Sequence, residues 1–77
     1  MRLSEFWALA DEVFGAAYAR TLTAGLVLGA LGDRTADGAL ADGVPPREVW
    51  TALCDDMDVP EGRRWGQQRP QRRGRPA

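Results

Sequence analysis

Three carboxylates occur almost in succession at Asp55, Asp56 and Asp58, and Glu48 lies seven residues before the first of them. The aspartates fall at the end of a predicted helix, where the helix dipole disfavours each negative charge by about 0.3–1 kcal/mol. Two explanations stay open, namely pairing with Arg63, Arg64 or the tail of the same chain, or docking of a basic protein partner. A metal site is not expected, because adjacent helical side chains diverge by about 100°. We call the four acids the acidic surface.

The chain lacks the residues on which the common nucleophilic mechanisms depend. It has no His and no Lys, and Ser4 is its only serine, so neither a Ser-His nor a Lys-based mechanism can be assembled. The single cysteine, Cys54, falls on the apolar stripe of a predicted helix, where burial raises the pKa of a thiol and suppresses its reactivity. No phosphate-binding glycine loop is present. We therefore expect no enzyme activity, no catalytic residue, no metal and no cofactor.

Six arginines and no acid occupy residues 63–77. This composition cannot bury enough apolar surface to fold, which predicts a disordered tail after a helical domain at residues 1–62. Guanidinium groups mixed with an aromatic ring and flexible spacers also suit binding of RNA or single-stranded nucleic acid. An inert extension, or one that docks a protein, fits equally well. The candidate nucleic-acid contacts are Arg63, Arg64, Trp65, Arg69, Arg72, Arg73 and Arg75.

Size and charge limit the remaining possibilities. A chain of 77 residues holds one core at most, and residues 1–62 carry four arginines against eleven acids, a net charge of −7. The first helix contains Glu5, Asp11 and Glu12, which interrupt any export signal, and the longest apolar stretch, 22–31, is half the length of a spanning helix. A lone cysteine suits a reducing compartment. We expect a cytoplasmic protein that does not enter a membrane.

The apolar spacing predicts about four helices. Ser4 is placed to cap the first, which Gly15 interrupts. A second helix is predicted from Ala16 to Leu31, with Gly32 as its stop, and it is apolar around most of its circumference, so it should be the most buried. Its apolar stripe is Tyr18, Leu22, Leu26 and Ala30. Two glycines on one face, Gly25 and Gly29, indicate close approach of another helix or a homodimer seam.

The second half of the chain resembles a helix-turn-helix unit. Thr35 is placed to cap a short helix that ends at Gly43, and a further helix begins after Pro45 and continues to about Asp58. Its predicted buried stripe is Val49, Trp50, Leu53, Cys54 and Met57. Recognition of DNA by this helix is not expected, because Arg47 is its only basic residue among four acids and the phosphate backbone would repel it.

Several separated motifs, in order along residues 1–64, resemble a family of short actinobacterial proteins, the domain of unknown function 3046 family. The motifs are Met1 to Trp7, Phe14-Gly15, Arg34-Thr35, Ala39 to Trp50, Leu53-Cys54 and Val59-Pro60. The resemblance implies no established activity, ligand or catalytic residue. Members of this family are often encoded near the recombinase RecA and its regulator RecX, which implies an association with DNA repair.

Together these observations predict an all-α fold, a small bundle of about four helices that contains a helix-turn-helix-like unit and ends in a disordered tail. The leading functional hypothesis is a non-enzymatic adaptor whose acidic surface meets an unknown protein partner. The alternative is a nucleic-acid-associated protein, linked to DNA repair, that uses the helix-turn-helix-like unit and the tail together. A homodimer is a further possibility.

Overall fold

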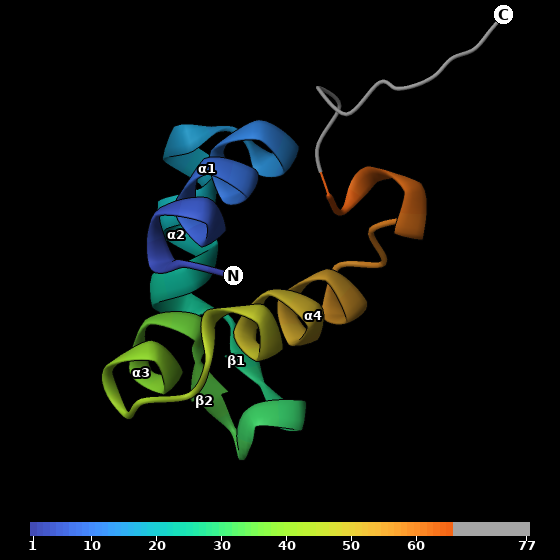
Figure 1. Cartoon of the computed structure of the whole chain (residues 1–77). Helices are drawn as coiled ribbons and strands as arrows, with labels where there is room; N and C mark the ends of the chain where they lie inside the picture. Colours follow the sequence, from blue (N-terminus) through green and yellow to red (C-terminus); the bar gives the residue numbers. More distant parts are fainter. Residues whose placement is uncertain (66–77) are drawn as a thin grey trace, which may run out of the picture.

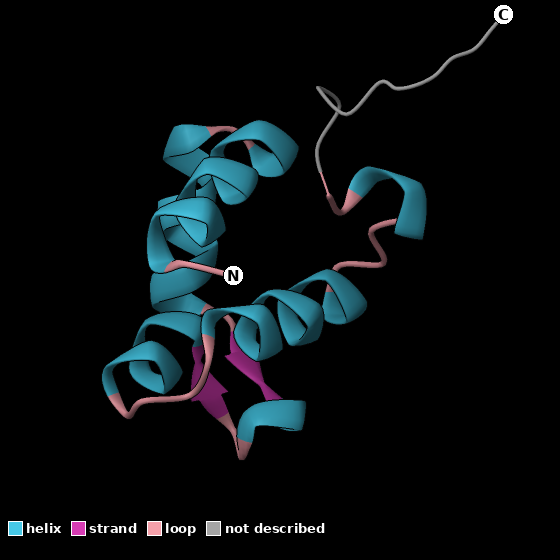
Figure 2. Ribbon diagram, in the orientation of Figure 1, coloured by secondary structure: helices cyan, strands magenta, loops and turns pink. Residues whose placement is uncertain are grey.

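The computed structural model describes residues 1–65, which form four α-helices and one small two-stranded sheet (Figures 1 and 2). Helix α1 (Leu3–Phe14) and helix α2 (Ala16–Gly25) lie side by side, and α2 runs back along α1. The short strands and helix α3 (Ala36–Ala41) follow at one end of this pair. Helix α4 (Pro46–Asp56) packs against α1 and α3, and a short 3₁₀ helix, η2 (Glu61–Arg63), follows it. The predicted helical bundle is confirmed.

The start of α1 differs from the prediction in its capping residue. Arg2 occupies the capping position, and its backbone N–H donates to Oε1 of Glu5 at 2.7 Å. Ser4 instead lies inside the first turn, so its predicted capping role is wrong. A carboxylate three residues into the helix reaches back to an unpaired backbone N–H and takes the place of a serine cap.

Gly15 makes the sharp turn between α1 and α2. Its backbone has φ 88° and ψ 143°, a conformation that residues other than glycine rarely adopt. Its N–H donates to the carbonyl of Asp11. No other atom would lie within 4 Å of an added Cβ, so the requirement for glycine is conformational and not steric.

We expect Gly15→Ala to lower the free energy of unfolding by about 1–3 kcal/mol, because alanine must be forced into this backbone region. The matched control is Gly25→Ala at the end of α2, where an added Cβ also meets nothing within 4 Å but the backbone is not left-handed. That change should be neutral or slightly stabilising. Urea denaturation of both variants measures the difference, and equal effects would contradict a conformational role for Gly15.

The predicted second helix from Ala16 to Leu31 is wrong in its second half. Helix α2 ends at Gly25, and the chain continues as strand β1 (Val27–Leu28), a 3₁₀ helix η1 (Gly29–Leu31) and strand β2 (Arg34–Thr35). The strands are antiparallel, with Val27 opposite Thr35 and Leu28 opposite Arg34. Two glycines and a β-branched valine within five residues weaken a helix, and leaving it lets Leu28 and Leu31 enter the core next to α4.

This correction changes two further predictions. Because Gly29 lies in the separate 3₁₀ helix η1 and not in α2, Gly25 and Gly29 do not share a face of one helix, and the glycine seam predicted for helix packing or a homodimer does not form. The predicted stripe also breaks up, since Tyr18 is 51% exposed and Ala30 is exposed. The most buried helix is α4 and not α2, because α4 is covered by α1, α3 and the strand region together.

The turn between α3 and α4 has the predicted local features. Oγ1 of Thr35 accepts from the backbone N–H of Gly38 at 3.0 Å and caps α3. Gly43 has φ 93° in the turn, and Ala39 and Val49 are fully buried where the two helices meet. Helix α3 ends at Ala41, two residues earlier than predicted.

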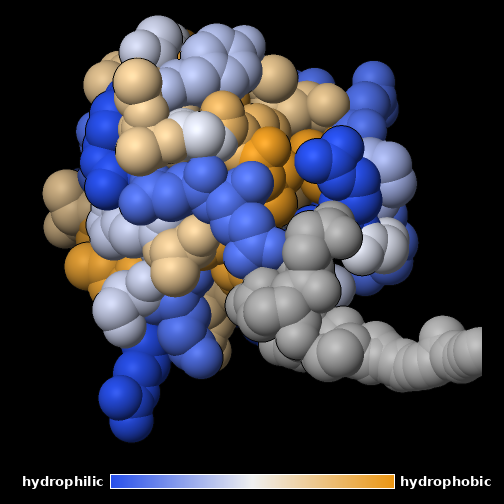
Figure 3. All heavy atoms as spheres, turned by 90° about the horizontal axis from the view of Figure 1, so that it is seen from above, coloured by the Kyte–Doolittle hydropathy of each residue, from blue (hydrophilic) through white to orange (hydrophobic). Residues whose placement is uncertain are grey.

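The core centres on Trp50, whose side chain is fully buried between α4 and α1. Its ring meets those of Phe6 and Phe14 edge to face, with ring centroids 5.7 and 6.0 Å apart. The buried apolar residues are Phe6, Leu9, Ala10, Ala19, Leu22, Leu28, Leu31, Ala36, Ala39, Val49, Trp50, Ala52, Leu53, Cys54 and Val59. On the face seen from above, hydrophobic side chains are visible between hydrophilic ones to the right of the centre, and others lie near the left edge (Figure 3).

Candidate functional site

A surface groove of about 470 Å³ lies along α4. Its α4 wall combines apolar and acidic groups, since Glu48, Ala52 and Asp55 recur at three- to four-residue intervals on one helix face. The other walls come from η1 and from the turn before α4. The lining residues are Ala30, Leu31, Pro45, Arg47, Glu48, Thr51, Ala52 and Asp55. We call this feature the α4 groove.

The acidic surface predicted from the sequence is divided by the fold. Glu48 and Asp55 line the α4 groove, but Asp56 lies one position round the helix and Asp58 lies beyond the helix end with φ 56°. One residue along an α-helix turns a side chain by about 100°, so Asp55 and Asp56 point in different directions. The groove therefore takes two of the four predicted acids.

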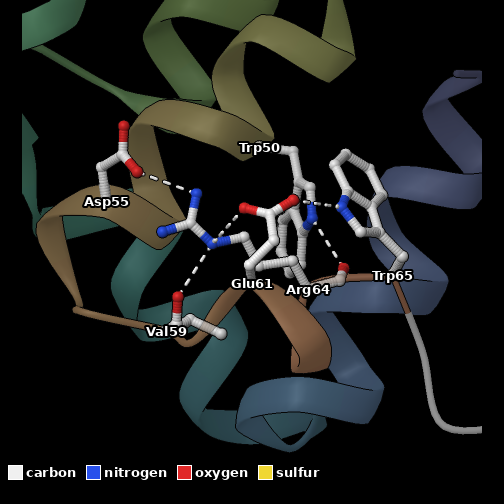
Figure 4. Close-up of polar contacts among 6 residues, drawn as sticks. All are labelled: Trp50, Asp55, Val59, Glu61, Arg64 and Trp65. Atoms are coloured by element: carbon white, nitrogen blue, oxygen red, sulfur yellow. Dashed lines mark hydrogen bonds and ion pairs between the residues drawn. The ribbon is translucent and has the colours of Figure 1, made fainter.

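Asp55 is paired with an arginine of the same chain, as one of the two sequence-based explanations predicted. Its Oδ1 lies 2.8 Å from an Nη atom of Arg64 (Figure 4). The hydrogen bond to Asp55 raises the pKa of the Arg64 guanidinium further above its ordinary value, so this group stays charged. The Arg64 side chain is only 14% exposed, whereas Asp55 is 64% exposed.

Arg64 also holds the end of the described chain against the core. Its Nε donates to the carbonyl of Val59 at 2.8 Å, and its own carbonyl accepts a 2.9 Å hydrogen bond from Nε1 of the buried Trp50 (Figure 4). We call residues 61–65 the C-terminal strap. Arg63, Arg64 and Trp65, which the sequence assigns to the tail, instead belong to the folded body: Arg63 ends η2, Arg64 bonds to Val59 and Trp50, and Trp65 packs against the core. The rest of the predicted tail, 66–77, lies outside the described residues.

These contacts change the set of candidate nucleic-acid contacts. Arg64 is held by Asp55 and Val59. The indole Nε1 of Trp65 donates to Oε2 of Glu61 at 3.1 Å. The guanidinium of Arg47 lies 5.1 Å from the centre of the Trp65 ring. Of the described candidates, Arg63 alone has an exposed side chain. The others, Arg69, Arg72, Arg73 and Arg75, lie outside the described residues.

Cys54 is fully buried, as its place on the apolar stripe predicted. Burial raises the pKa of its thiol to about 12, and the nearby Arg64 charge opposes this only in part. The thiol is therefore protonated at neutral pH and lacks the exposure and thiolate character of a nucleophile.

Within residues 1–65, no three acidic or thiol side chains gather where they could hold a metal ion. None of the helices formed by these residues has the length and apolar character needed to cross a membrane.

Sequence reasoning missed the groove and the strap for the same reason. The apolar spacing predicts one continuous helix through Ala30 and Leu31, so no sequence pattern places these residues beside α4. The contact between Arg47 and Trp65 joins residues eighteen positions apart and has no local pattern. The only available signal was the charge complementarity between the aspartates and the arginines that follow them.

A segment of this chain is similar to part of a larger protein. Over 40 residues, 49% of this chain, it is 55% identical to Rv2742c of Mycobacterium tuberculosis, whose provisional description is an envelope-preserving system protein. The matched segment covers 14% of that protein's length. No solved structure matches this chain. Residues 1–62 match the family described as "Protein of unknown function (DUF3046)", and that range includes α1 to α4. The chain therefore belongs to this DUF3046 family.

Proposed function

We propose that this chain is a non-enzymatic adaptor of the cytoplasm that binds a protein partner in the α4 groove. The observation that supports this proposal is the make-up of the groove, where the apolar atoms of Leu31, Pro45 and Ala52 lie beside the carboxylates of Glu48 and Asp55. Protein interfaces combine a buried apolar centre with a polar rim, and rim charges select partners of opposite charge. A partner segment with apolar and basic side chains has the matching chemistry.

The composition of the chain supports a non-enzymatic role. No His or Lys exists to act as a base, and the one thiol is buried and protonated. The groove contains carboxylates and an arginine, but its Asp55 is committed to an ion pair with Arg64. Exposed carboxylates suit recognition of a surface of opposite charge.

A pair of charge reversals on α4 tests the groove. We expect Glu48→Arg to abolish recovery of the partner in a pull-down from the native cell, because it places a positive charge in the groove. Asp56→Arg is the matched control, since it makes the same change in charge on the same helix but outside the groove. It should leave recovery unchanged. Nuclease treatment of the lysate separates protein-mediated from nucleic-acid-mediated capture.

The outcomes of this comparison are distinct. Loss of a nuclease-resistant partner with Glu48→Arg alone supports the groove. Equal loss with both variants shows that general negative charge attracts the partner, and equal retention places the interface elsewhere. Recovery of a differently tagged copy of the chain would show that the partner is a second copy and that the chain forms a homodimer.

The second candidate is a nucleic-acid-associated protein linked to DNA repair, and the exposed Arg63 next to four further arginines in the sequence favours it. Because Arg64 is held by Asp55, five arginines remain for phosphate contacts. The slope of log affinity against log salt should then be about −3.5 for single strands and about −4.5 for duplex DNA. Helix α4 does not favour direct reading of DNA, since Glu48, Asp55 and Asp56 outnumber Arg47.

A further inference from the structure

Asp55 belongs to two features at once. It lines the α4 groove, and it forms the ion pair that holds Arg64 of the C-terminal strap. The carboxylate is 64% exposed, so a group entering from solvent can reach it, whereas the Arg64 side chain on its other side is 14% exposed. Occupation of the groove and attachment of the strap therefore depend on the same carboxylate.

The strap covers a sensitive part of the core. The Arg64 carbonyl is the acceptor for the Trp50 indole N–H, and the Arg64 guanidinium bonds to the Val59 carbonyl (Figure 4). Cys54 is fully buried and comes directly before Asp55, and its backbone carbonyl accepts from the N–H of Val59, whose own carbonyl bonds to Arg64. Detachment of Arg64 together with its backbone would remove the hydrogen-bond partner of Trp50, and we expect it to expose the thiol of Cys54 to solvent.

The second ion pair of the strap is too weak to hold it alone. Glu61 and Arg64 approach only to 3.9 Å, and the Glu61 side chain is 77% exposed. Exposed pairs of this kind contribute little to stability. The contact between Asp55 and Arg64, at 2.8 Å, is the closer of the two ion pairs, and it acts together with the hydrogen bonds that join Arg64 to Val59 and Trp50.

We propose that an arginine of the partner takes Asp55 away from Arg64, so that binding in the α4 groove releases the C-terminal strap. This inference rests on the proposed function, and it adds the partner's chemistry and the response of the chain. The 2.8 Å ion pair between Arg64 and Asp55 shows that a guanidinium can approach this carboxylate closely. Glu48, on the same face of α4 and about two turns before Asp55, gives the incoming segment a second carboxylate. A lysine lacks the planar fork that pairs with a carboxylate through two parallel bonds.

Labelling of Cys54 by a disulfide reagent at neutral pH reports release of the strap in the full chain. We expect Arg64→Gln and Asp55→Asn each to increase the labelling rate about tenfold or more, because local opening exposes the thiol. Arg64→Lys, which keeps the charge, should lie between them and the wild type. Asp56→Asn is the matched control, as it neutralises the neighbouring carboxylate outside the groove, and it should label at the wild-type rate.

Circular dichroism establishes that each variant is folded before labelling. If Arg64→Gln does not fold, Asp55→Asn and Arg64→Lys provide the same comparison. Wild-type rates in all folded variants would overturn the proposal, because the strap would then not protect Cys54.

A peptide probe tests the coupling itself. The probe is acetyl-Leu-Arg-Ala-Leu-Arg amide, and the control is the same peptide with lysine in place of arginine. The arginine peptide should accelerate labelling of the wild-type chain, and the lysine peptide should do so much less. Neither should accelerate labelling of Asp55→Asn further. Binding of the arginine peptide, measured by calorimetry and lost in Glu48→Arg, with no change in labelling would overturn the coupling and leave the groove proposal intact. Absence of both binding and acceleration would count against both.

Discussion

Replacement of Trp50 by alanine is expected to lower the free energy of unfolding by about 3–5 kcal/mol, which is enough to unfold a domain of this size. The side chain is fully buried and contacts Phe6 and Phe14 of α1, so its removal leaves a large cavity between α1 and α4. It also leaves the Arg64 carbonyl without the indole N–H that donates a hydrogen bond to it. Urea denaturation followed by far-UV circular dichroism measures the loss.

Trp7→Ala is the matched control for this substitution. Trp7 is only partly buried, and one face of its ring is covered by the Arg20 guanidinium at 4.2 Å and not by the core. Its loss should therefore destabilise the chain much less. A cooperative transition in Trp50→Ala with the wild-type midpoint would show that Trp50 is not the centre of the core.

The stability of the chain is expected to fall as the pH rises from about 9 towards 12, because of Cys54. Burial raises the pKa of this thiol from the ordinary value of 9.0 to about 12. In this window the folded state retains the thiol proton and the unfolded state has lost it. The unfolded state binds fewer protons, so the free energy of unfolding decreases with pH, with a slope of up to about 1.4 kcal/mol per pH unit. Below pH 9 both states hold the proton, and the contribution is constant.

Urea denaturation at pH 8, 9, 10 and 11 of the wild type and of Cys54→Ala isolates this effect. The two chains differ only at residue 54, so the difference between the two curves belongs to Cys54. The variant should have a lower free energy of unfolding at pH 8 but a flatter pH dependence. Parallel curves would show that the thiol titrates alike in the folded and unfolded chains.

Much of the local structure could be predicted from the sequence, because local patterns determine it. Helical spacing predicted α4 and the burial of Val49, Trp50, Leu53 and Cys54, although the helix ends at Asp56 and Met57 beyond it is only partly buried. Thr35 predicted the cap of α3, because its side chain accepts from a backbone N–H three residues on. The interruption at Gly15 follows from a single residue type that tolerates a positive φ. The burial of Cys54 followed from its position in the α4 stripe.

Predictions that depended on competition between distant segments were less accurate. The segment after Gly25 is apolar enough for a helix, but pairing of Val27 with Thr35 and packing of Leu28 and Leu31 against α4 stabilise the strand and the 3₁₀ turn instead. Local propensity cannot report the contacts with α4, because that helix begins fifteen residues after Leu31.

By itself, the sequence determined the all-helical class, the lack of the usual nucleophile and base pairs, and the opposite charges of residues 1–62 and 63–77. The tertiary structure alone decided which charges meet. It separated Asp56 and Asp58 from the α4 groove, and it placed Arg64 on Asp55 and under the Trp50 indole. The physical reason is that an ion pair needs its two groups within about 4 Å, and only the packed chain brings residues nine positions apart to that distance.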